Sequence, residues 1–362
     1  MELITQPDDG PSRLLSALKS AKKSIEVAIF RFDRNDIEES LKSAVPRGVK
    51  VTALIAGTNR GGERGLRLLE TRLLGAGIIV ARTAGDLLRY HDKFIIVDRS
   101  ILHVLSFNFT HLDMDHSRGF GIVTKNKTLV EEAIRLFEAD CTRKKYSSSS
   151  DEFVVSPANS RKVLHHFLAR ARKQLLIYDP QISDKQMIGV LQQRAKAGVE
   201  VRIIGKSARL LGAQVHKLTR MRLHTRTIIR DGRQVFVGSQ SLRPAELDSR
   251  RELGLIVREP KLVNRVLATF ESDWKAADGT GAIDTGDDER SAAVSKEAAD
   301  RVVAVVAREL RPLAGTVKNA VNKVIAQTGD DVLRDKIVKT TVKKVIKKAV
   351  KKAVKEAVES AK

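Results

Sequence analysis

The chain has 362 residues, of which 42% are hydrophobic, so it is long enough for two domains of ordinary size or for one duplicated domain with an appendage. Its one cysteine, Cys141, excludes an internal disulfide framework, and its net charge of +22 predicts a polyanionic partner, either nucleic acid or an anionic lipid surface. The N-terminal sequence MELITQPDDG lacks the features of a signal peptide and no segment approaches the ~20 apolar residues of a membrane span, so we expect a cytoplasmic protein that can still lie at a membrane surface.

Helix and strand patterns alternate in the first part of the chain. A helical pattern at 14–23 precedes the strand SIEVAIF at 24–30, and a second helix leads into the strand that begins with GVKV at 48–51. The apolar run at 94–97 predicts a strand covered on both faces, and further strands and a closing helix follow it. This alternation favours an α/β sandwich.

The stretch RYHDKFIIVDRS, residues 89–100, places polar residues around that buried strand. His91 and Lys93 are two residues apart, so in an extended chain they project to the same face at the start of the strand. Asp98 follows the strand. An imidazole beside an ammonium is suited to phosphate chemistry, but three residues at a fixed spacing recur by chance, so the pattern needs support from its context.

A second copy of the stretch, LHTRTIIRDGR at 223–233, supplies that support at an offset of 133 residues. The motif residues of this copy are His224, Arg226 and Asp231. The register then holds for roughly fifty residues, and it pairs RGFGIV at 118–123 with RELGLI at 251–256 and LFEADC at 136–141 with TFESDW at 269–274. The chain therefore contains an internal duplication.

Upstream of the motifs the two copies match with a different offset. GVKV at 48–51 and GVEV at 198–201 are 150 residues apart, so the first copy has 17 extra residues before its histidine. The Gly- and Arg-rich segment 58–77 predicts an inserted loop and a short helix there. A serine run in TRKKYSSSSDEF and the acidic, Gly-rich AADGTGAIDTGDDERS are typical of linkers. We expect a first half at 1–145, a second half at 151–277, and a linker with a basic tail at 278–362.

Two H-x-(K/R)-x4-D motifs in one chain, each followed by a Ser-x-(Asn/Ser) element, resemble the phospholipase D superfamily, and in particular its cardiolipin synthase and phosphatidyltransferase branch. The resemblance spans both halves and implies two α/β sandwich halves related by a pseudo-twofold axis. It also implies one shared site, in which one histidine attacks phosphorus to give a phosphohistidine and the other protonates the leaving alkoxide. Neither a metal nor another cofactor is implied.

The resemblance assigns roles to individual residues. Those expected to be catalytic are His91, Lys93, His224, Arg226 and Glu252. Those expected to bind the substrate phosphate are Ser106, Asn108, Ser239 and Ser241. The motif aspartates Asp98 and Asp231 are expected to be structural, tying the motif strands to their neighbours.

Three departures from the family pattern bear on activity. Leu105 stands where a glycine is usual, Arg226 replaces the lysine, and Ser241 replaces the asparagine. An arginine keeps the positive charge and can clamp a phosphate with two hydrogen bonds, but it does not reproduce the point charge of a lysine. Reduced activity is therefore one expectation.

A fourth departure concerns the carboxylate that usually bonds the histidine. Glu252 matches it in the second half, whereas Gly119 occupies the equivalent place in the first. Asp113 or Asp115 could replace the missing group, although the sequence does not show that either reaches His91.

The tail predicts a basic amphipathic helix. Its apolar residues recur every four positions, at Val338, Val342, Ile346, Val350, Val354 and Val358. Lysine pairs lie between them. An anionic membrane surface, nucleic acid, and helix-to-helix association through the valine stripe are all candidate roles, and the oligomeric state stays open.

We expect a phospholipase D-like phosphodiesterase or phosphatidyltransferase acting on phospholipid headgroups. The alternatives are a nuclease or DNA-processing phosphodiesterase of the same fold, and a catalytically weak phosphate- or nucleic-acid-binding protein. Which histidine attacks stays open. The first half retains the lysine and the asparagine, which favours His91, whereas a position of Glu252 beside His224 would favour the other histidine.

Overall fold

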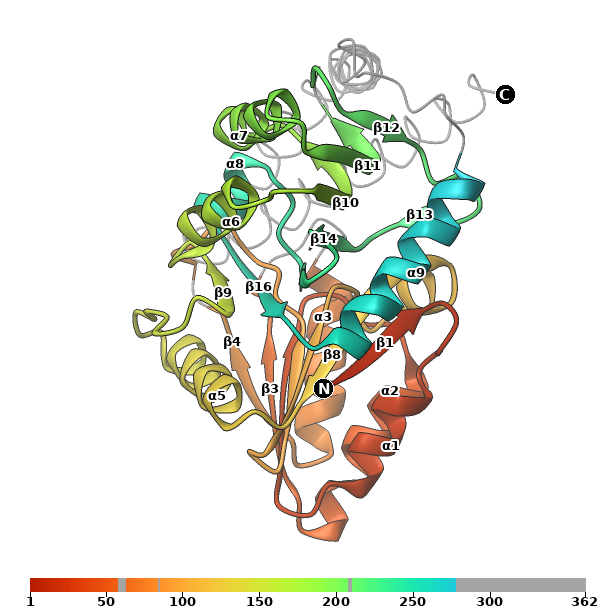
Figure 1. Ribbon diagram of the computed structural model, residues 1–362. Coiled ribbons are helices and arrows are strands. Elements are labelled where there is room, and N and C mark those ends of the chain that lie inside the picture. Colours follow the sequence, from red (N-terminus) through yellow and green to blue (C-terminus); the bar gives the residue numbers. More distant parts are fainter. Residues whose placement is uncertain (58–62, 84, 208–209, 278–362) are drawn as a thin grey trace, which may run out of the picture. The chain divides into compact units, whose positions relative to one another are not determined.

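The structure is a computed structural model that describes residues 1–57, 63–83, 85–207 and 210–277 (Figure 1). It has a mixed α/β fold with two sheets, which confirms the predicted fold class. The basic tail helix expected within 278–362 lies outside the described residues. Of the helices within the described ranges, none is both long and apolar enough to cross a bilayer.

The first half contains the sheet ordered β1-β8-β7-β6-β2-β3-β4. The strands of this half are β1 (Glu2–Gln6), β2 (Ser24–Ile29), β3 (Lys50–Ile55), β4 (Ile79–Arg82), β5 (Arg89–Tyr90), β6 (Phe94–Val97), β7 (Ile101–Leu105) and β8 (Ser117–Thr124). Its helices are α1 (Ser12–Ser20), α2 (Asn35–Lys42), the 3-10 turn η1 (Val45–Arg47), α3 (Glu63–Gly75), α4 (His111–Asp115) and α5 (Lys127–Thr142).

The second half contains the sheet ordered β12-β11-β10-β14-β15-β16, with β9 also paired to β16. Its strands are β9 (Phe153–Ser156), β10 (Gln174–Ile182), β11 (Glu200–Ser207), β12 (Gln214–His216), β13 (Arg222–Leu223), β14 (Arg226–Arg230), β15 (Gln234–Gly238) and β16 (Arg250–Val257). Its helices are α6 (Ser160–Ala169), α7 (Lys185–Lys196), α8 (Pro244–Asp248) and α9 (Pro260–Ala276).

The two halves repeat the same series of strands and α-helices, with one exception. Helix α3 lies between β3 and β4, whereas the described residues between β11 and β12 contain no helix. This is the position at which the change of offset from 150 to 133 predicts an insertion with a helix.

The core forms layers on both sides of each sheet. Leucines of α1, α2 and α3 pack on one face of the first sheet, and α6 and α7 cover one face of the second (Figure 1). The opposite faces share one apolar cluster that also contains residues of α5 and α9. In β6 all four residues are buried, with Phe94 and Ile96 in the shared cluster and Ile95 and Val97 beneath the helices. The apolar run at 94–97 is therefore covered on both faces, as predicted.

Two short strands cross from one half to the other. Strand β5 pairs in parallel with β16 of the second half, and β13 pairs in parallel with β8 of the first. Each short strand comes directly before a motif histidine. Reciprocal pairing of this kind is what a pseudo-twofold relation between duplicated halves produces.

Buried ion pairs follow the same reciprocal pattern. Arg118 of β8 makes two hydrogen bonds to Asp273 of α9, with N···O distances of 2.7 and 3.0 Å. Arg251 of β16 makes two to Asp140 of α5, both at 2.9 Å. All four residues are buried and occupy matching positions in RGFGIV and RELGLI and in LFEADC and TFESDW. Their role in joining the halves was not recognised from the sequence, although the repeat itself paired them.

Candidate active site

The backbone amide of each motif histidine donates a hydrogen bond to a strand of the opposite half. The amide of His91 donates to the carbonyl of Arg251 at 2.8 Å, and the amide of His224 donates to the carbonyl of Arg118 at 3.2 Å. Both residues are almost completely buried, with 7% and 6% of their surface exposed. The crossing strands β5 and β13 therefore place both motifs at the interface between the sheets.

Glu252 bonds to His91 and not to His224. Its Oε2 lies 2.8 Å from Nδ1 of His91, and the carboxylate is fully buried. The sequence-based placement of Glu252 beside His224 was therefore wrong, because alignment within the repeat does not reveal that β16 pairs with the strand preceding the other half's histidine.

Asp113 of α4 is the carboxylate that faces His224. Its Oδ2 lies 3.5 Å from Nδ1 of His224, which has no hydrogen-bond partner among the described residues. Three donors orient this carboxylate: the amide and the side chain of Asn108, at 2.8 and 2.6 Å, and Arg222, at 2.5 Å. Hydrogen bonds of this kind are often long without substrate and shorten when it binds.

A packing difference explains why the first half has no glutamate at the position that matches Glu252. A Cβ atom on Gly119 would lie 2.9 Å from the ring of Phe107, so this aromatic ring fills the space. The offset of 133 pairs Asp113 with Glu246, which accepts the amide of Ser241 at 2.7 Å as Asp113 accepts that of Asn108. An acid in both copies of this segment was the sequence signal that could have singled out Asp113.

Lys93 and Arg226 make equivalent contacts. The ammonium of Lys93 donates to the carbonyl of His91, and Arg226 donates to the carbonyl of His224 at 2.6 Å. Lys93 is fully buried, and its Nζ lies 5.3 Å from the centre of the Phe30 ring. Arg226 also donates to the hydroxyl of Ser241 at 3.2 Å. The arginine and the serine that depart from the family pattern therefore contact each other.

The electrostatics of the site favour neutral histidines. Burial lowers the pKa of His91 well below its ordinary value, and the charges of Lys93 and Arg226 lower it further. Burial also lowers the pKa of His224 well below its ordinary value. Asp113 opposes this effect, and the charges of Arg226, Arg222 and Lys93 add to it. Lys93 and Arg226 thus act on both histidines, which means that charges from both halves converge on one site.

The pKa values of the other ionisable groups reflect the same burial. Burial lowers the pKa of Lys93 to about 7, against the opposing effect of Glu252. Burial raises the pKa of Glu252, although nearby Lys93 lowers it. For Asp113, burial raises the pKa, but His224, Asn108 and Arg222 together bring it below the ordinary value. Asp113 is therefore the more acidic of the two histidine partners.

The four residues expected to bind phosphate fall into two groups. Asn108 donates to Asp113, and Ser241 accepts from Arg226. Oδ1 of Asn108 is buried without a hydrogen-bond partner among the described residues. The hydroxyls of Ser106 and Ser239 accept backbone amides of the adjacent strand, from Phe120 at 2.9 Å and Leu253 at 3.1 Å, and the Ser239 hydroxyl also lowers the pKa of Glu252. A phosphate-binding role for these two serines stays a prediction.

The motif aspartates bind backbone in both halves. Asp98 accepts the amides of Lys22, Lys23 and Ser24, with the shortest distance 2.6 Å. Asp231 accepts those of residues 172–174, with the shortest distance 2.7 Å. Each carboxylate thereby anchors the end of a motif strand to the loop before the neighbouring strand, which is the contact that a structural role requires.

No cluster of three or more His, Cys, Asp or Glu side chains in the described parts of the chain is arranged to hold a metal ion. The polar atoms left unpaired at the site are instead Nδ1 of His224, Oδ1 of Asn108 and Oε1 of Glu252. Buried polar atoms normally have partners, so this grouping indicates a place for a polar ligand.

Among solved structures, polyphosphate kinase from Porphyromonas gingivalis matches with a TM-score of 0.65 at 20% identity, covering 75% of this chain and 50% of that one. Phosphatidylserine synthase from Haemophilus influenzae matches with a TM-score of 0.57 at 11% identity, covering 76% and 85%. At these identities the similarity concerns the fold.

Sequence relatives include polyphosphate kinase from Prosthecochloris aestuarii, which is 26% identical over 299 residues. The match covers 71% of this chain but only 41% of that relative. Mitochondrial cardiolipin hydrolase from Canis lupus familiaris is 33% identical over 129 residues, covering 35% of this chain and 46% of the relative. The family described as cardiolipin synthase, phospholipase D-like domain, matches residues 14–141 and 164–274, both motifs included. The chain therefore belongs to this phospholipase D-like family.

Proposed function

We propose that this protein is a phosphodiesterase or phosphatidyltransferase that acts on phospholipid headgroups through a phosphohistidine and without a metal ion. The observation that supports it best is the reciprocal arrangement of the histidines and carboxylates. Glu252 lies 2.8 Å from His91, and Asp113 lies 3.5 Å from His224. Each histidine thus faces a carboxylate from the opposite half.

In the first step, Nε2 of neutral His91 attacks phosphorus and forms a P–N bond. Glu252 accepts a hydrogen bond from Nδ1–H, which fixes the tautomer that leaves a lone pair on Nε2. The P–O bond to the leaving alkoxide breaks, and this oxygen takes a proton from His224. The bound phosphodiester is an anion, so it raises the pKa of His224 from its depressed value and allows that histidine to carry the proton.

In the second step, water or an acceptor alcohol attacks the phosphohistidine. Neutral His224 takes the proton of the attacking hydroxyl, the P–N bond breaks, and His91 is regenerated. Lys93 and Arg226 supply positive charge where the phosphoryl oxygens become more negative. Hydrolysis and transfer then differ only in the acceptor.

A second candidate is phosphoryl transfer to or from inorganic polyphosphate. It is favoured by the polyphosphate kinase relative, whose match covers 71% of this chain. His91 would carry the phosphoryl group in the covalent intermediate, and the shortened polyphosphate would replace the alkoxide as the leaving group.

A substrate panel tests both candidates and the nuclease alternative. It contains cardiolipin and phosphatidylglycerol vesicles, single- and double-stranded DNA, inorganic polyphosphate and bis(p-nitrophenyl) phosphate. We expect turnover of the phospholipids in EDTA. Activity on polyphosphate alone would favour the second candidate, activity on DNA alone would favour a nuclease, and a requirement for an added divalent cation would contradict the metal-independent mechanism.

Trapping of the intermediate tests the roles of the two histidines. Rapid quenching with labelled substrate should yield an acid-labile, base-stable adduct on the wild-type protein and none on His91→Ala. His224→Ala should accumulate the adduct when p-nitrophenol leaves, because the first step then needs no acid and the second lacks its base. His216→Ala is the matched control, since His216 stacks on Trp274 and belongs to neither motif. An adduct on His91→Ala would reverse the assignment.

A further inference from the structure

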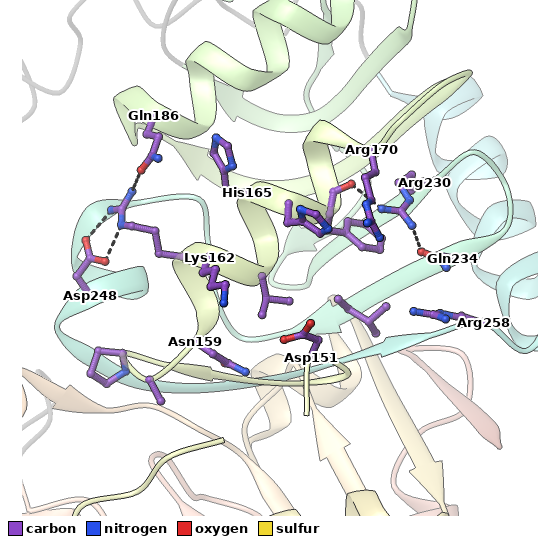
Figure 2. A pocket seen from close by; sticks show the side chains of 17 residues that line it. Asp151, Asn159, Lys162, His165, Arg170, Gln186, Arg230, Gln234, Asp248 and Arg258 are labelled. Carbon is purple, nitrogen blue, oxygen red and sulfur yellow. Dashed lines mark hydrogen bonds and ion pairs between the residues drawn. The ribbon is translucent and has the colours of Figure 1, made fainter. Parts of the chain in front are cut away.

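A polar cavity lies in the second half, and none of the histidines, basic residues or aspartates that define the two motifs lines it. It has a volume of about 720 Å³ and is bordered by α6, by the ends of β14 and β16, and by the segment before β9. Arg170, Arg230 and Arg258 lie along one side, and Gln186 and Asp248 lie on the other (Figure 2). Its most distinctive feature is the group of three arginines.

Arg230 is fixed in place by uncharged partners. Its guanidinium donates to the carbonyl of Phe167 at 2.9 Å and to the side chain of Gln234, and it lies 4.5 Å from the centre of the Phe167 ring. No carboxylate within ion-pair distance of it occurs among the residues that the structure describes. A guanidinium carries five N–H donors, so these two acceptors leave others available.

Arg170 and Arg258 bring like charge towards Arg230. Burial lowers the pKa of Arg230, and the charges of Arg170 and Arg258 lower it further, against Asp231. Arg170 has no ion-pair partner in the described parts of the chain, and Arg258 lies only as close as 3.7 Å to Glu152. Three guanidinium groups therefore line one cavity, with Asp231 and Glu152 as nearby opposite charges, and a bound anion would lessen the repulsion between the three cations.

The acidic residues around the cavity are mostly engaged elsewhere. Asp248 pairs with Arg161 at 2.5 Å, and Asp231 accepts the three backbone amides described above. Asp151 also lines the cavity. An adjoining hollow shares Arg170, Arg230 and Gln234, and together the two linings contain eight Lys or Arg against three Asp.

The internal duplication shows that the fold does not require two of these arginines, Arg170 and Arg230. With the offsets of the repeat, Ser20 corresponds to Arg170 and Val97 to Arg230, and Ala17 corresponds to Phe167. The strand register agrees with this correspondence. Val97 of β6 pairs with Ile25, and Arg230 of β14 pairs with Leu175, the residue that corresponds to Ile25. The first half thus folds with a small and an apolar residue at the positions of Arg170 and Arg230, whereas Arg258 corresponds to Lys125, which keeps the positive charge.

We propose that this cavity binds a multiply charged phosphate anion at a site separate from the motif histidines. The planar fork of arginine matches phosphate geometry, and three such groups suit a ligand with more than one negative charge. A soluble phosphorylated molecule and a phospholipid headgroup present the same chemistry. The proposal does not depend on the catalytic mechanism, because none of its residues takes part in that mechanism.

Calorimetric titration of the full chain with inorganic pyrophosphate tests the site directly. All proteins carry two background changes: His91→Asn removes covalent chemistry, and Arg226→Ala weakens phosphate binding at the motifs. Binding should persist in this background and weaken at least about tenfold on Arg170→Ser or Arg230→Val, each of which loses one charged donor to the anion. Both replacements are the residues of the first half, and a thermal melt of each variant checks folding.

Lys19→Gln is the charge-matched control, because it removes one exposed cation from α1, the helix that corresponds to α6. Equal weakening in this control, or displacement of pyrophosphate by sodium chloride of the same ionic strength, would overturn the proposal by showing a general charge effect. A second arm measures co-sedimentation with phosphatidic acid vesicles against phosphatidylcholine vesicles. Dependence on Arg170 and Arg230 in either arm supports the site and identifies the source of the phosphate. Independence in both arms overturns it.

Discussion

Each motif histidine takes its carboxylate partner from the opposite half. Glu252 reaches His91 because β16 pairs with the strand before that histidine, and Asp113 approaches His224 from a helix that Asn108 and Arg222 hold in place. The two partners differ in identity and in distance. This asymmetry favours different roles for two histidines that are equivalent by sequence.

Asp113→Asn should slow the first step only when the leaving group needs a proton. We expect a fall of about 10²-fold or more in single-turnover cleavage of an alkyl phosphodiester, which is the scale of general acid catalysis. The burst of p-nitrophenol should change little. Glu252→Gln should slow both substrates, because it acts on the attacking histidine. If Asp113→Asn slowed both equally, the assignment of His224 as the acid would be lost.

Replacement of Arg226 distinguishes an active enzyme from a weak one. Arg226→Ala should lower kcat by roughly 10²-fold or more, as expected for one preorganised charge-stabilising donor. Arg226→Lys should keep or raise activity, because it restores the family residue. Steady-state rates on a phosphodiester measure both effects. If only Arg226→Lys were active, the arginine would have silenced the site, and a binding function would be favoured.

The depressed pKa of Lys93 predicts a pH limit. Phosphate binding needs the ammonium form, which exists below the pKa of about 7 that burial imposes. The value of kcat/KM reports the free enzyme and should therefore fall as the pH rises above about 7. Lys93→Arg should remove this alkaline limb, because a guanidinium keeps its charge. An alkaline limb that is unchanged in Lys93→Arg would assign it to another group.

At the level of elements, the duplicated strands are anchored by the same aspartate contact. Asp98 accepts three amides from the loop between α1 and β2, and its φ of 52° places it in the left-handed region that asparagine also tolerates. The end of β6 is thereby held to the start of β2. The motif aspartate thus explains the position of the strand and not the chemistry of the site.

Asp98→Asn should reduce stability and leave kcat nearly unchanged. An amide oxygen accepts more weakly than a carboxylate, and hydrogen bonds to charged groups contribute about 1.5–3 kcal/mol each, so a loss of about 1–3 kcal/mol in the free energy of unfolding is expected. Urea denaturation measures it, and single-turnover rates in the folded protein provide the control. A large fall in kcat with unchanged stability would contradict the structural role.

At the scale of the whole described fold, two buried ion pairs join the halves. Arg118 also donates to the carbonyl of Gln6 at 2.9 Å, and Arg251 to that of Ser156 at 3.0 Å, so each arginine ties the first strand of its own half to the last helix of the other. Because the candidate site is assembled from both halves, these contacts also hold the two motif histidines together.

Arg118→Met should be strongly destabilising, because the buried carboxylate of Asp273 loses both hydrogen bonds to its nearest cation. Breaking one partner of a buried pair costs about 3–5 kcal/mol, and adding Asp273→Leu should recover part of the loss. Arg13→Met is the control, since Arg13 pairs with Glu2 at the surface and such pairs contribute about 0–1 kcal/mol. Urea denaturation should show one transition for both halves. Independent unfolding of the halves would contradict a shared core.

The sequence alone was sufficient to detect the duplication, to predict the α/β class and to single out the two motif histidines. A short run of apolar residues, such as that at 94–97, predicts a buried strand from neighbouring residues alone. A constant offset between similar segments reveals a repeat without any structure. The change of offset also located the inserted α3. These features depend on residues that are near one another in sequence.

Only the tertiary structure decided which groups act on which. The pairings of Glu252 with His91, Asp113 with His224, and Arg118 with Asp273 each join residues more than one hundred positions apart. In a duplicated chain, every motif position has two equivalent partners, one within its own half and one across the interface. Local pattern cannot choose between them, because the choice depends on the crossing of β5 and β13 into the opposite half and on packing such as that of Phe107 against Gly119.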